Sequence, residues 1–260
     1  MRKTFSRIAI SLVPALAVPL CGGIKQAQAF VFFSARDLNP ASGNAVPPLT
    51  DFPNSSQAEA DFLSELSASV ATEDFEGFNS GQTSPLALVF PGAGTATLLG
   101  SGQVNPNSSS QSINGAYAIS GNQNYLVQGG DTFTIDFSEP IAGFGFYITD
   151  LGSEVFLNLS LVGGGFEQIP VAATENFSGS DRRSGSVQYE GAIAENETEL
   201  FTSLEITSQT DGQLDGFGID ELTLAGPEQV ASVPEPAAVL SLSLFALWGY
   251  GMKKGRQKKV

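Results

Sequence analysis

Apolar residues recur at every second position in several short segments of the chain between residues 71 and 225. The clearest segments are 133–137, 144–148 and 155–161, which carry Phe, Ile, Val or Leu at alternate positions. Gly, Asn, Ser and Asp are frequent between these segments. A period of two is typical of a β-strand with at least one buried face, so each segment predicts a strand.

Additional short strands and turns are expected elsewhere in the same region. About ten short strands with no helix between them are typical of two packed antiparallel sheets. The sequence therefore predicts an all-β domain over residues 70–226, an antiparallel β-sandwich with a jelly-roll-like topology. The further strands are expected around 86–90, 95–99, 116–128, 186–191, 204–206 and 217–219, and turns at Glu139-Pro140 and at Gly163–Gly165.

One helix is expected before this domain. Residues 30–69 contain four prolines between positions 40 and 53 and indicate an irregular N-terminal extension. Within it, Ser56 and Glu59 have the spacing of a capping box, and apolar residues follow at helical intervals, which predicts a short helix over 56–69. After the domain, residues 227–232 are expected to form a linker.

Residues 1–29 have the three parts of a secretory signal peptide. A basic start precedes an apolar stretch over 8–20, and Ala27 and Ala29 form a small-x-small cleavage site before Phe30. We expect export through the Sec translocon and cleavage by signal peptidase, so that the mature chain begins at Phe30. An uncleaved anchor is the alternative, but the apolar stretch is short and contains two prolines.

The C-terminal residues 233–260 also have three parts. The motif Val233-Pro234-Glu235-Pro236 precedes an apolar run over 237–252, and five basic residues follow. The run with its flanking motif is long enough for a transmembrane helix, and the basic residues place the preceding domain outside the membrane.

This tripartite tail resembles the PEP-CTERM sorting signal. The resemblance implies that an exosortase, a membrane peptidase, cleaves near Pro-Glu-Pro and transfers the protein to the cell surface or the extracellular matrix. Proteins with such tails are typical of bacteria that produce exopolysaccharide. The alternative is a C-terminal membrane anchor that is never processed.

Charge is distributed unevenly between the domain and its two ends. Four of the 12 basic residues lie in 1–29 and five in 233–260, whereas Glu235 is the only one of the 27 acidic residues outside 30–232. Residues 30–232 therefore carry a formal charge of −23, against −15 for the whole chain. Such a domain repels nucleic acid, so we expect no nucleic-acid partner.

The composition also excludes several kinds of chemistry. The chain has no His, which removes Ser-His-Asp triads and His-ligated zinc or haem, and its one Cys lies within residues 1–29. Among the aromatic residues, 19 Phe against 5 Tyr and one Trp indicate core packing rather than display. A stacking surface for sugars is the less favoured role for four tyrosines on the expected strands, Tyr117, Tyr125, Tyr147 and Tyr189.

Two acidic clusters bracket the expected sandwich. Asp74 and Glu76 lie at its start, and Asp215, Asp220 and Glu221 lie at its end. First and last strands of a jelly roll are commonly close together, and calcium prefers carboxylate and carbonyl oxygens, so these five residues form a candidate calcium site. Surface-exposed turn carboxylates are the alternative. The clusters resemble the opening and closing strands of calcium-bearing jelly rolls such as MAM adhesion domains, although the MAM cysteines are absent.

A second resemblance covers most of residues 58–225. The segments 73–77, 83–86, 90–92 and 141–150 are similar to a recurring uncharacterised ectodomain of cyanobacterial PEP-CTERM proteins. This resemblance implies a fold and a location but no catalytic residues.

The sequence thus predicts a non-enzymatic, exported surface or matrix protein that associates with extracellular polysaccharide or neighbouring surface components. Calcium is a possible cofactor, and the membrane is a partner through the C-terminal helix before processing. The alternative is a carboxylate-dependent glycan hydrolase at the cell surface, which would need two acidic side chains in a cleft. The Glu-x-Asp-x-x-Glu motif of sandwich glycosidases, the Gly-x-Ser-x-Gly motif and the P-loop are all absent.

Overall fold

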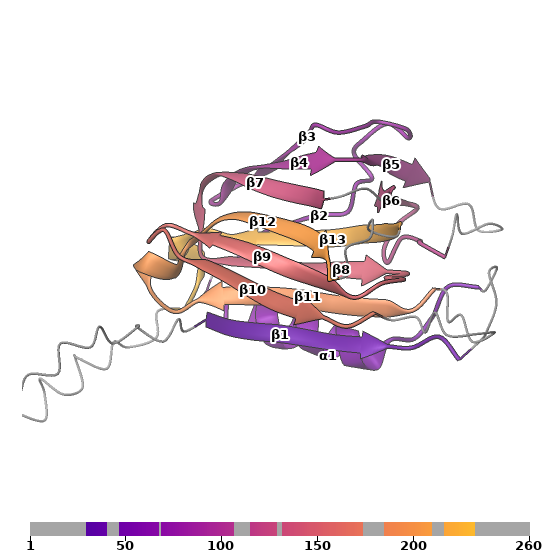
Figure 1. Ribbon diagram of the computed structural model, residues 1–260, viewed down its shortest axis with the longest axis horizontal. Helices are drawn as coiled ribbons and strands as arrows, with labels where there is room; N and C mark the ends of the chain where they lie inside the picture. The colour runs from indigo at the N-terminus through magenta and orange to yellow at the C-terminus, as the bar shows by residue number, and fades with distance from the viewer. Residues whose placement is uncertain are drawn as a thin grey trace, which may run out of the picture.

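The computed structural model is a sandwich of two antiparallel β-sheets with one α-helix on its surface (Figure 1). Thirteen strands are present in the described part of the chain, which confirms the all-β antiparallel sandwich predicted from the sequence. The structure describes residues 30–40, 47–67, 69–106, 115–128, 132–173, 185–209 and 216–231.

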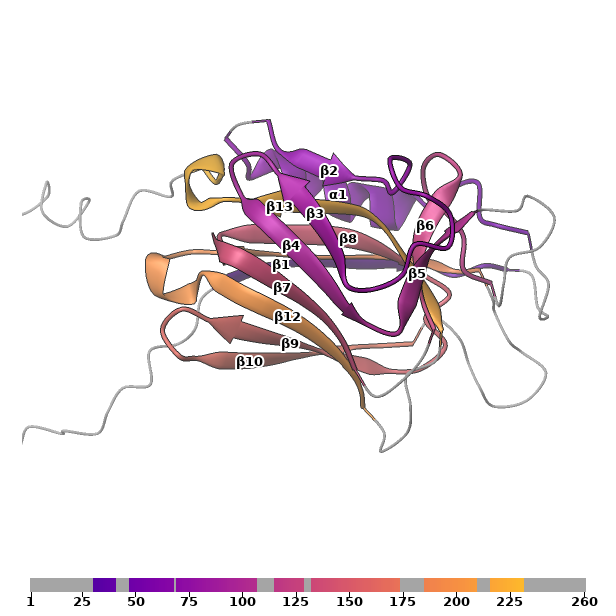
Figure 2. The same cartoon turned by 90° about the horizontal axis from the view of Figure 1, so that it is seen from above.

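The first sheet has six strands in the order β10-β9-β12-β7-β4-β3. From β6 to β9 the chain passes from one sheet to the other at each connection. Figure 2 shows this sheet facing the viewer. Its strands are β3 (Leu86–Phe90), β4 (Gly94–Gly100), β7 (Thr132–Ile141), β9 (Val155–Leu161), β10 (Phe166–Val171) and β12 (Phe201–Ser208).

The second sheet has seven strands, six of them in the order β1-β11-β8-β13-β6-β5, and β2 pairs with β13 beside this path. Edge strands β1 and β10 thus border the same open side of the sandwich, as Figure 1 shows. The strands are β1 (Phe30–Asp37), β2 (Ala71–Glu73), β5 (Gly102–Pro106), β6 (Gln123–Val127), β8 (Gly143–Thr149), β11 (Val187–Ala194) and β13 (Phe217–Ala225).

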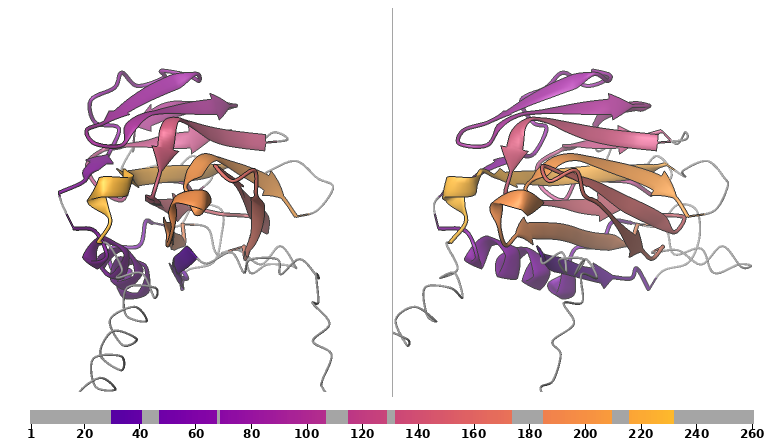
Figure 3. Two further views of the ribbon diagram at one scale, coloured as in Figure 1. Left: turned by 90° about the vertical axis from the view of Figure 1, so that its left-hand side faces the viewer. Right: turned by 60° about the vertical axis from the view of Figure 1, so that its left-hand side comes forward.

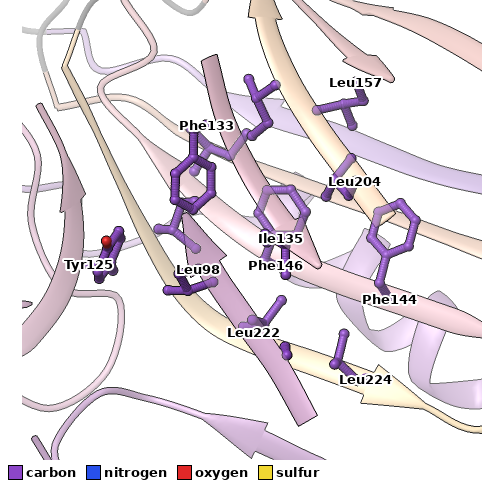
Figure 4. Close-up of a cluster of buried hydrophobic side chains, with 14 of the residues drawn as sticks. Leu98, Tyr125, Phe133, Ile135, Phe144, Phe146, Leu157, Leu204, Leu222 and Leu224 are labelled. Carbon is purple, nitrogen blue, oxygen red and sulfur yellow. The ribbon is translucent and has the colours of Figure 1, made fainter. Parts of the chain in front are cut away.

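The alternating apolar residues meet between the two sheets. In the six-stranded sheet the register aligns Leu159, Leu204, Ile135 and Leu98 across four neighbouring strands, and all four are at most 1% exposed. Burial of one such side chain contributes about 1.5–3 kcal/mol to stability. Figure 4 shows this cluster with side chains of the facing sheet, including Phe144 and Phe146.

Helix α1 (Pro53–Ser64) covers the outer side of the seven-stranded sheet, against β1 and β11 (Figure 3). Phe62 is fully buried there and contacts Tyr189, with 6.1 Å between the ring centroids. The sequence predicted a start at Ser56 with a capping box, but the helix begins three residues earlier. The reason is a distant cap: the carboxylate of Asp37 accepts the backbone N–H groups of Asn54 and Ser55 at 3.2 and 2.8 Å.

The predicted N-terminal extension is instead part of the sandwich. Residues 30–37 form edge strand β1, which pairs with β11 along its whole length. Its apolar side chains lie on both faces, because Phe32 packs in the sandwich core and Phe33 packs under α1. A strand buried on both faces shows no alternation, which is why the sequence pattern did not indicate it.

Two other predictions are corrected at element boundaries. Strand β7 runs through Glu139-Pro140 to Ile141 without the expected turn. The expected linker is also ordered: residues 227–229 form a 3-10 helix, and Val230 pairs with Leu66. The expected hairpin turn at Gly163–Gly165 is confirmed between β9 and β10, and a second 3-10 helix spans Glu197–Glu199.

The predicted addressing segments lie outside the described residues. These are the signal peptide with Ala27 and Ala29, and the sorting motif with the helix expected over 237–252. Phe30, the predicted first residue of the mature chain, is the first residue of β1. Within the described ranges, no helix has the length and apolar character needed to cross a membrane.

Candidate functional site

The acidic residues predicted to bind calcium do not form a metal site in the part of the chain that the structure describes. No group of three or more Asp, Glu, His or Cys side chains there is placed to hold an ion. Asp215 lies outside the described residues. Of the other candidates, Asp74 and Glu76 each accept backbone N–H groups on one carboxyl oxygen, and Asp220 accepts them on both.

Asp220 is held in β13 by three hydrogen bonds and is only 1% exposed. Its Oδ2 accepts the N–H groups of Ile119 and Ser120 at 2.7 and 3.1 Å, and its Oδ1 accepts that of Glu221 at 2.9 Å. Burial raises the pKa of Asp220 to about 8, although the three donors act in the opposite direction. Glu221 has a positive φ of 51° at a bulge, where pairing with β8 shifts between Asp220 and Thr223.

Glu76 holds the other end of the same segment. Its Oε1 accepts the N–H groups of Asn122 and Gln123, the latter at 2.6 Å. Asp74 accepts the N–H of Glu76 at 3.1 Å and so fixes the turn that carries it. We call residues 119–123 the clamped turn, because Asp220 and Glu76 bind its two ends. Residues from the two acidic clusters therefore bind one segment as hydrogen-bond acceptors.

The side of the six-stranded sheet that faces away from the core, here called the outer face, is lined mostly by polar side chains. Thr132, Thr134 and Asp136 alternate on β7 with buried Phe133 and Ile135, so they lie on this face. Helix α1 lies on the opposite side of the molecule (Figure 3). By the strand registers the outer face also carries Thr97, Phe156, Asn158, Ser160, Phe166, Gln168, Ser203, Glu205 and Thr207.

A row of bonded polar side chains crosses β10, β9 and β12 on the outer face. Gln168 donates from Nε2 to Oδ1 of Asn158 at 2.9 Å, and Asn158 donates from Nδ2 to Oγ1 of Thr207 at 2.8 Å. We call these three residues the amide row. Two aromatic rings flank it: Phe156 is half-buried and Phe166 is 59% exposed. Phe166 pairs with Ser160 of β9. Ser160 is four residues from Phe156 on the same strand, which is roughly 13 Å.

The exposed aromatic residues are not the ones that the sequence singled out. All four candidate tyrosines are at most 2% exposed, so in the structure they are core residues and form no stacking surface. Sequence reasoning missed Phe156 and Phe166 because it assigned the phenylalanines to the core. The available signal was the phase of the alternation in β9: Phe156 lies between Val155 and Leu157 and must therefore point to the other face.

A hollow opens between edge strands β1 and β10. It has a volume of about 300 Å³. We call it the edge pocket. It is lined by Ser34, Ala35, Arg36, Pro170, Val171, Ala172 and Gln188.

A buried carboxyl group lies directly behind this pocket. Glu190 is fully buried, and its Oε1 accepts hydrogen bonds from Oγ of Ser34, at 2.9 Å, and from Nε2 of Gln188. Burial raises the pKa of Glu190 to about 7, although both hydrogen bonds lower it. Oε2 of Glu190 and Oε1 of Gln188 have no hydrogen-bond partner among the described residues.

No protein-family model matches the chain, and the search of curated proteins finds no match. Among solved structures, the K2 cleaved adhesin domain of Lys-gingipain aligns with 60% of this chain and 98% of that chain, at 12% identity and a TM-score of 0.37. The xylan-binding domain CBM22-1 from Paenibacillus barcinonensis aligns with 64% and 97%, at 14% identity and a TM-score of 0.34. A family 11 carbohydrate-binding module from Clostridium thermocellum aligns with 61% and 96%, at 12% identity and a TM-score of 0.29. Similarity this low transfers neither a ligand nor an activity to this chain.

Proposed function

We propose that the chain is an exported, non-enzymatic surface or matrix protein that binds extracellular polysaccharide on the outer face of its six-stranded sheet. The observation that carries this proposal is the amide row between the rings of Phe156 and Phe166. Asn158 at the centre of the row is only 5% exposed, whereas Gln168 is exposed, so a polymer would contact the row mainly through Gln168 and the flanking rings.

The chemistry of this surface suits a hydroxylated polymer. Amide and hydroxyl groups both donate and accept hydrogen bonds, as sugar hydroxyls do. Because Gln168 and Asn158 are already bonded to their neighbours, little side-chain entropy is lost when a ligand joins the row. The faces of Phe156 and Phe166 offer apolar contacts to the C–H faces of sugar rings.

The predicted addresses agree with an extracellular role. Signal cleavage after Ala29 would keep in the mature chain every residue of β1 that the structure describes. The charge of −23 over residues 30–232 opposes binding to nucleic acid. In this proposal the Sec translocon exports the chain, the C-terminal helix holds it in the membrane, and an exosortase transfers it to the surface or matrix.

Glycan hydrolysis is the second candidate, and one pair of residues favours it. Asp136 and Glu205 lie on the outer face at diagonal positions of the adjacent strands β7 and β12, where Cα atoms are about 7–8 Å apart. Side chains on Cα atoms at this spacing can place their carboxyl groups within the range of about 5–9.5 Å that glycosidases use. Incubation with the host's exopolysaccharide tests this alternative: release of reducing sugar that Glu205→Gln abolishes would establish it, whereas the binding proposal expects none.

Cosedimentation of the purified full-length protein with the host's exopolysaccharide tests the binding proposal. We expect the wild-type protein to sediment with the polymer and Phe166→Ala to remain largely in the supernatant. Leu63→Ala is the matched control, because Leu63 is an exposed apolar residue of α1 on the opposite side of the sandwich. Equal sedimentation of Phe166→Ala and Leu63→Ala would refute the proposed site.

A further inference from the structure

The edge pocket has features that the proposed polysaccharide site does not use. It opens between β1 and β10 at the side of the sandwich, whereas the amide row lies on the outer face. Its volume of about 300 Å³ is at the lower end of the range for small-molecule sites. The pocket therefore suits a single small ligand rather than the body of a polymer.

Two buried oxygens lack donors among the described residues: one belongs to Gln188, which lines the pocket, and the other to Glu190, which lies behind it. Oε1 of Gln188 and Oε2 of Glu190 are both inaccessible to solvent and have no hydrogen-bond partner within the described part of the chain. An unpaired buried acceptor is a free-energy cost, because it has lost its water without gaining a donor. A ligand hydroxyl group that donates to Gln188 would remove the cost at that residue, so the pocket favours a hydroxylated ligand.

The pocket also contains a guanidinium group. Arg36 is the only Lys or Arg among the residues that the structure describes. It is exposed, and its Nη1 donates to the carbonyl of Ala173 at 3.1 Å, whereas its other donors have no partner in the described ranges. A guanidinium with free N–H groups binds a carboxylate in a planar, two-point geometry.

We propose that the edge pocket binds a sugar acid, with its carboxylate on Arg36 and its hydroxyl groups on Ser34 and Gln188, the other polar residues that line it. This site goes beyond the proposed polysaccharide surface and does not depend on it. The high pKa of Glu190 reduces the negative charge behind the ligand. At physiological salt the Debye length is about 8 Å, so charges further away than this are largely screened, and Arg36 is the charged residue that lines the pocket.

Calorimetric titration of the full-length protein in 150 mM salt tests the proposal, with glucuronate and glucose as probes. We expect glucuronate to bind at least about tenfold more tightly than glucose, because hydrogen bonds to a charged group contribute about 1.5–3 kcal/mol. Arg36→Gln is expected to lower the affinity for glucuronate about tenfold and to leave that for glucose unchanged. Absence of glucuronate binding, or equal affinities in Arg36→Gln, would overturn the proposal.

Two further experiments identify the source of the ligand and distinguish the edge pocket from the outer face. If a polyuronate binds only when its chain ends are intact, the pocket captures the terminal residue of a polymer. If only free glucuronate binds, the ligand is a small metabolite. Both results support the proposed pocket. Phe166→Ala is expected to bind glucuronate normally, because Phe166 lies on the outer face. If Phe166→Ala reduces glucuronate affinity as much as Arg36→Gln does, the acid binds outside the pocket and the proposal is wrong. The melting temperature of each variant shows that it is folded.

Discussion

Glu76 and Asp220, which are far apart in the chain, bind the two ends of the same clamped turn. Glu76 follows β2, and Asp220 belongs to β13, which pairs with β2. The turn leads into β6, a further neighbour of β13. These carboxylates therefore connect the beginning, the middle and the end of the domain, which is a structural role.

Removal of the Asp220 carboxylate is expected to destabilise the domain more than removal of the Glu76 carboxylate. Asp220→Ala leaves three backbone N–H groups without their acceptor and is expected to lower the free energy of unfolding by roughly 3 kcal/mol. Glu76 is exposed, so water replaces its contacts and Glu76→Ala is expected to cost about 1 kcal/mol.

Urea denaturation measures both values, with the exposed Glu195→Ala as the control. Ordinary surface substitutions change the free energy of unfolding by about 0.5 kcal/mol or less. If Asp220→Ala differs from the wild type by no more than this, the proposed structural role of Asp220 is contradicted. Repeating the measurement with added calcium tests the metal site predicted from the sequence. If calcium stabilises the wild type but not Asp220→Ala, the result would support the predicted calcium site.

Asp37 is expected to stabilise α1 as a distant N-terminal cap. Asp37→Ala removes the acceptor for the N–H groups of Asn54 and Ser55 and is expected to cost about 1–2 kcal/mol. Asp37→Asn keeps one carbonyl oxygen and is expected to lose less. Thermal unfolding followed by circular dichroism gives the ranking, and an Asn variant as unstable as the Ala variant would argue against hydrogen bonding as the cause.

The buried carboxyl of Glu190 is expected to make stability decrease as pH rises. Its pKa is about 7 in the folded chain against an ordinary value of 4.5, so between these values the unfolded chain releases the proton that the folded chain keeps. The contribution is complete below pH 4.5 and is lost as pH rises towards 7. At about 1.4 kcal/mol per pKa unit, the loss amounts to roughly 3 kcal/mol.

Glu190→Gln removes this titration and keeps the shape of the side chain. The pKa of Asp220 is also raised, so the difference between wild type and variant is the informative quantity rather than either profile alone. Chemical denaturation between pH 5 and pH 8 is expected to show the wild type losing stability relative to Glu190→Gln. A difference that does not change with pH would show that Glu190 does not titrate in this range.

The termini of the native protein test the proposed export and sorting. Mass spectrometry of protein from the cell surface of its host is expected to find Phe30 at the N-terminus and a C-terminus near Pro234-Glu235-Pro236. A C-terminal peptide that ends at Val260 would show that the tail is a permanent anchor. An N-terminal peptide that begins before Phe30 would contradict the predicted cleavage site.

The strands with one polar face could be predicted closely from the sequence, and the strand with two apolar faces could not. Segment 155–161 was predicted as a strand with the bounds that β9 has. Strand β1 was missed because α1 packs on its second face. No local sequence pattern indicates that a helix will pack on a given strand. The start of α1 was also misplaced, because its cap is Asp37, a residue of the preceding strand.

Candidate sites were harder to predict than strands, because they depend on contacts between distant residues. The sequence predicted that the acidic clusters form a calcium site, but spacing cannot distinguish a carboxylate that faces a cation from one that faces N–H groups. Ser34 and Glu190 are hydrogen-bonded although they are far apart in the chain. Only the pairing of β1 with β11 brings Ser34, which lines the edge pocket, next to Glu190, which lies behind it.

Hydroxyl-radical footprinting of the full-length protein with and without the host's exopolysaccharide tests the central claim most directly. The method reports the solvent exposure of individual side chains. The proposed function predicts reduced oxidation of Phe156 and Phe166 in the presence of the polymer, and unchanged oxidation of Leu63 on α1, which lies on the opposite side of the sandwich. Unchanged oxidation of Phe156 and Phe166 when the polymer is bound would show that the outer face is not the polysaccharide site.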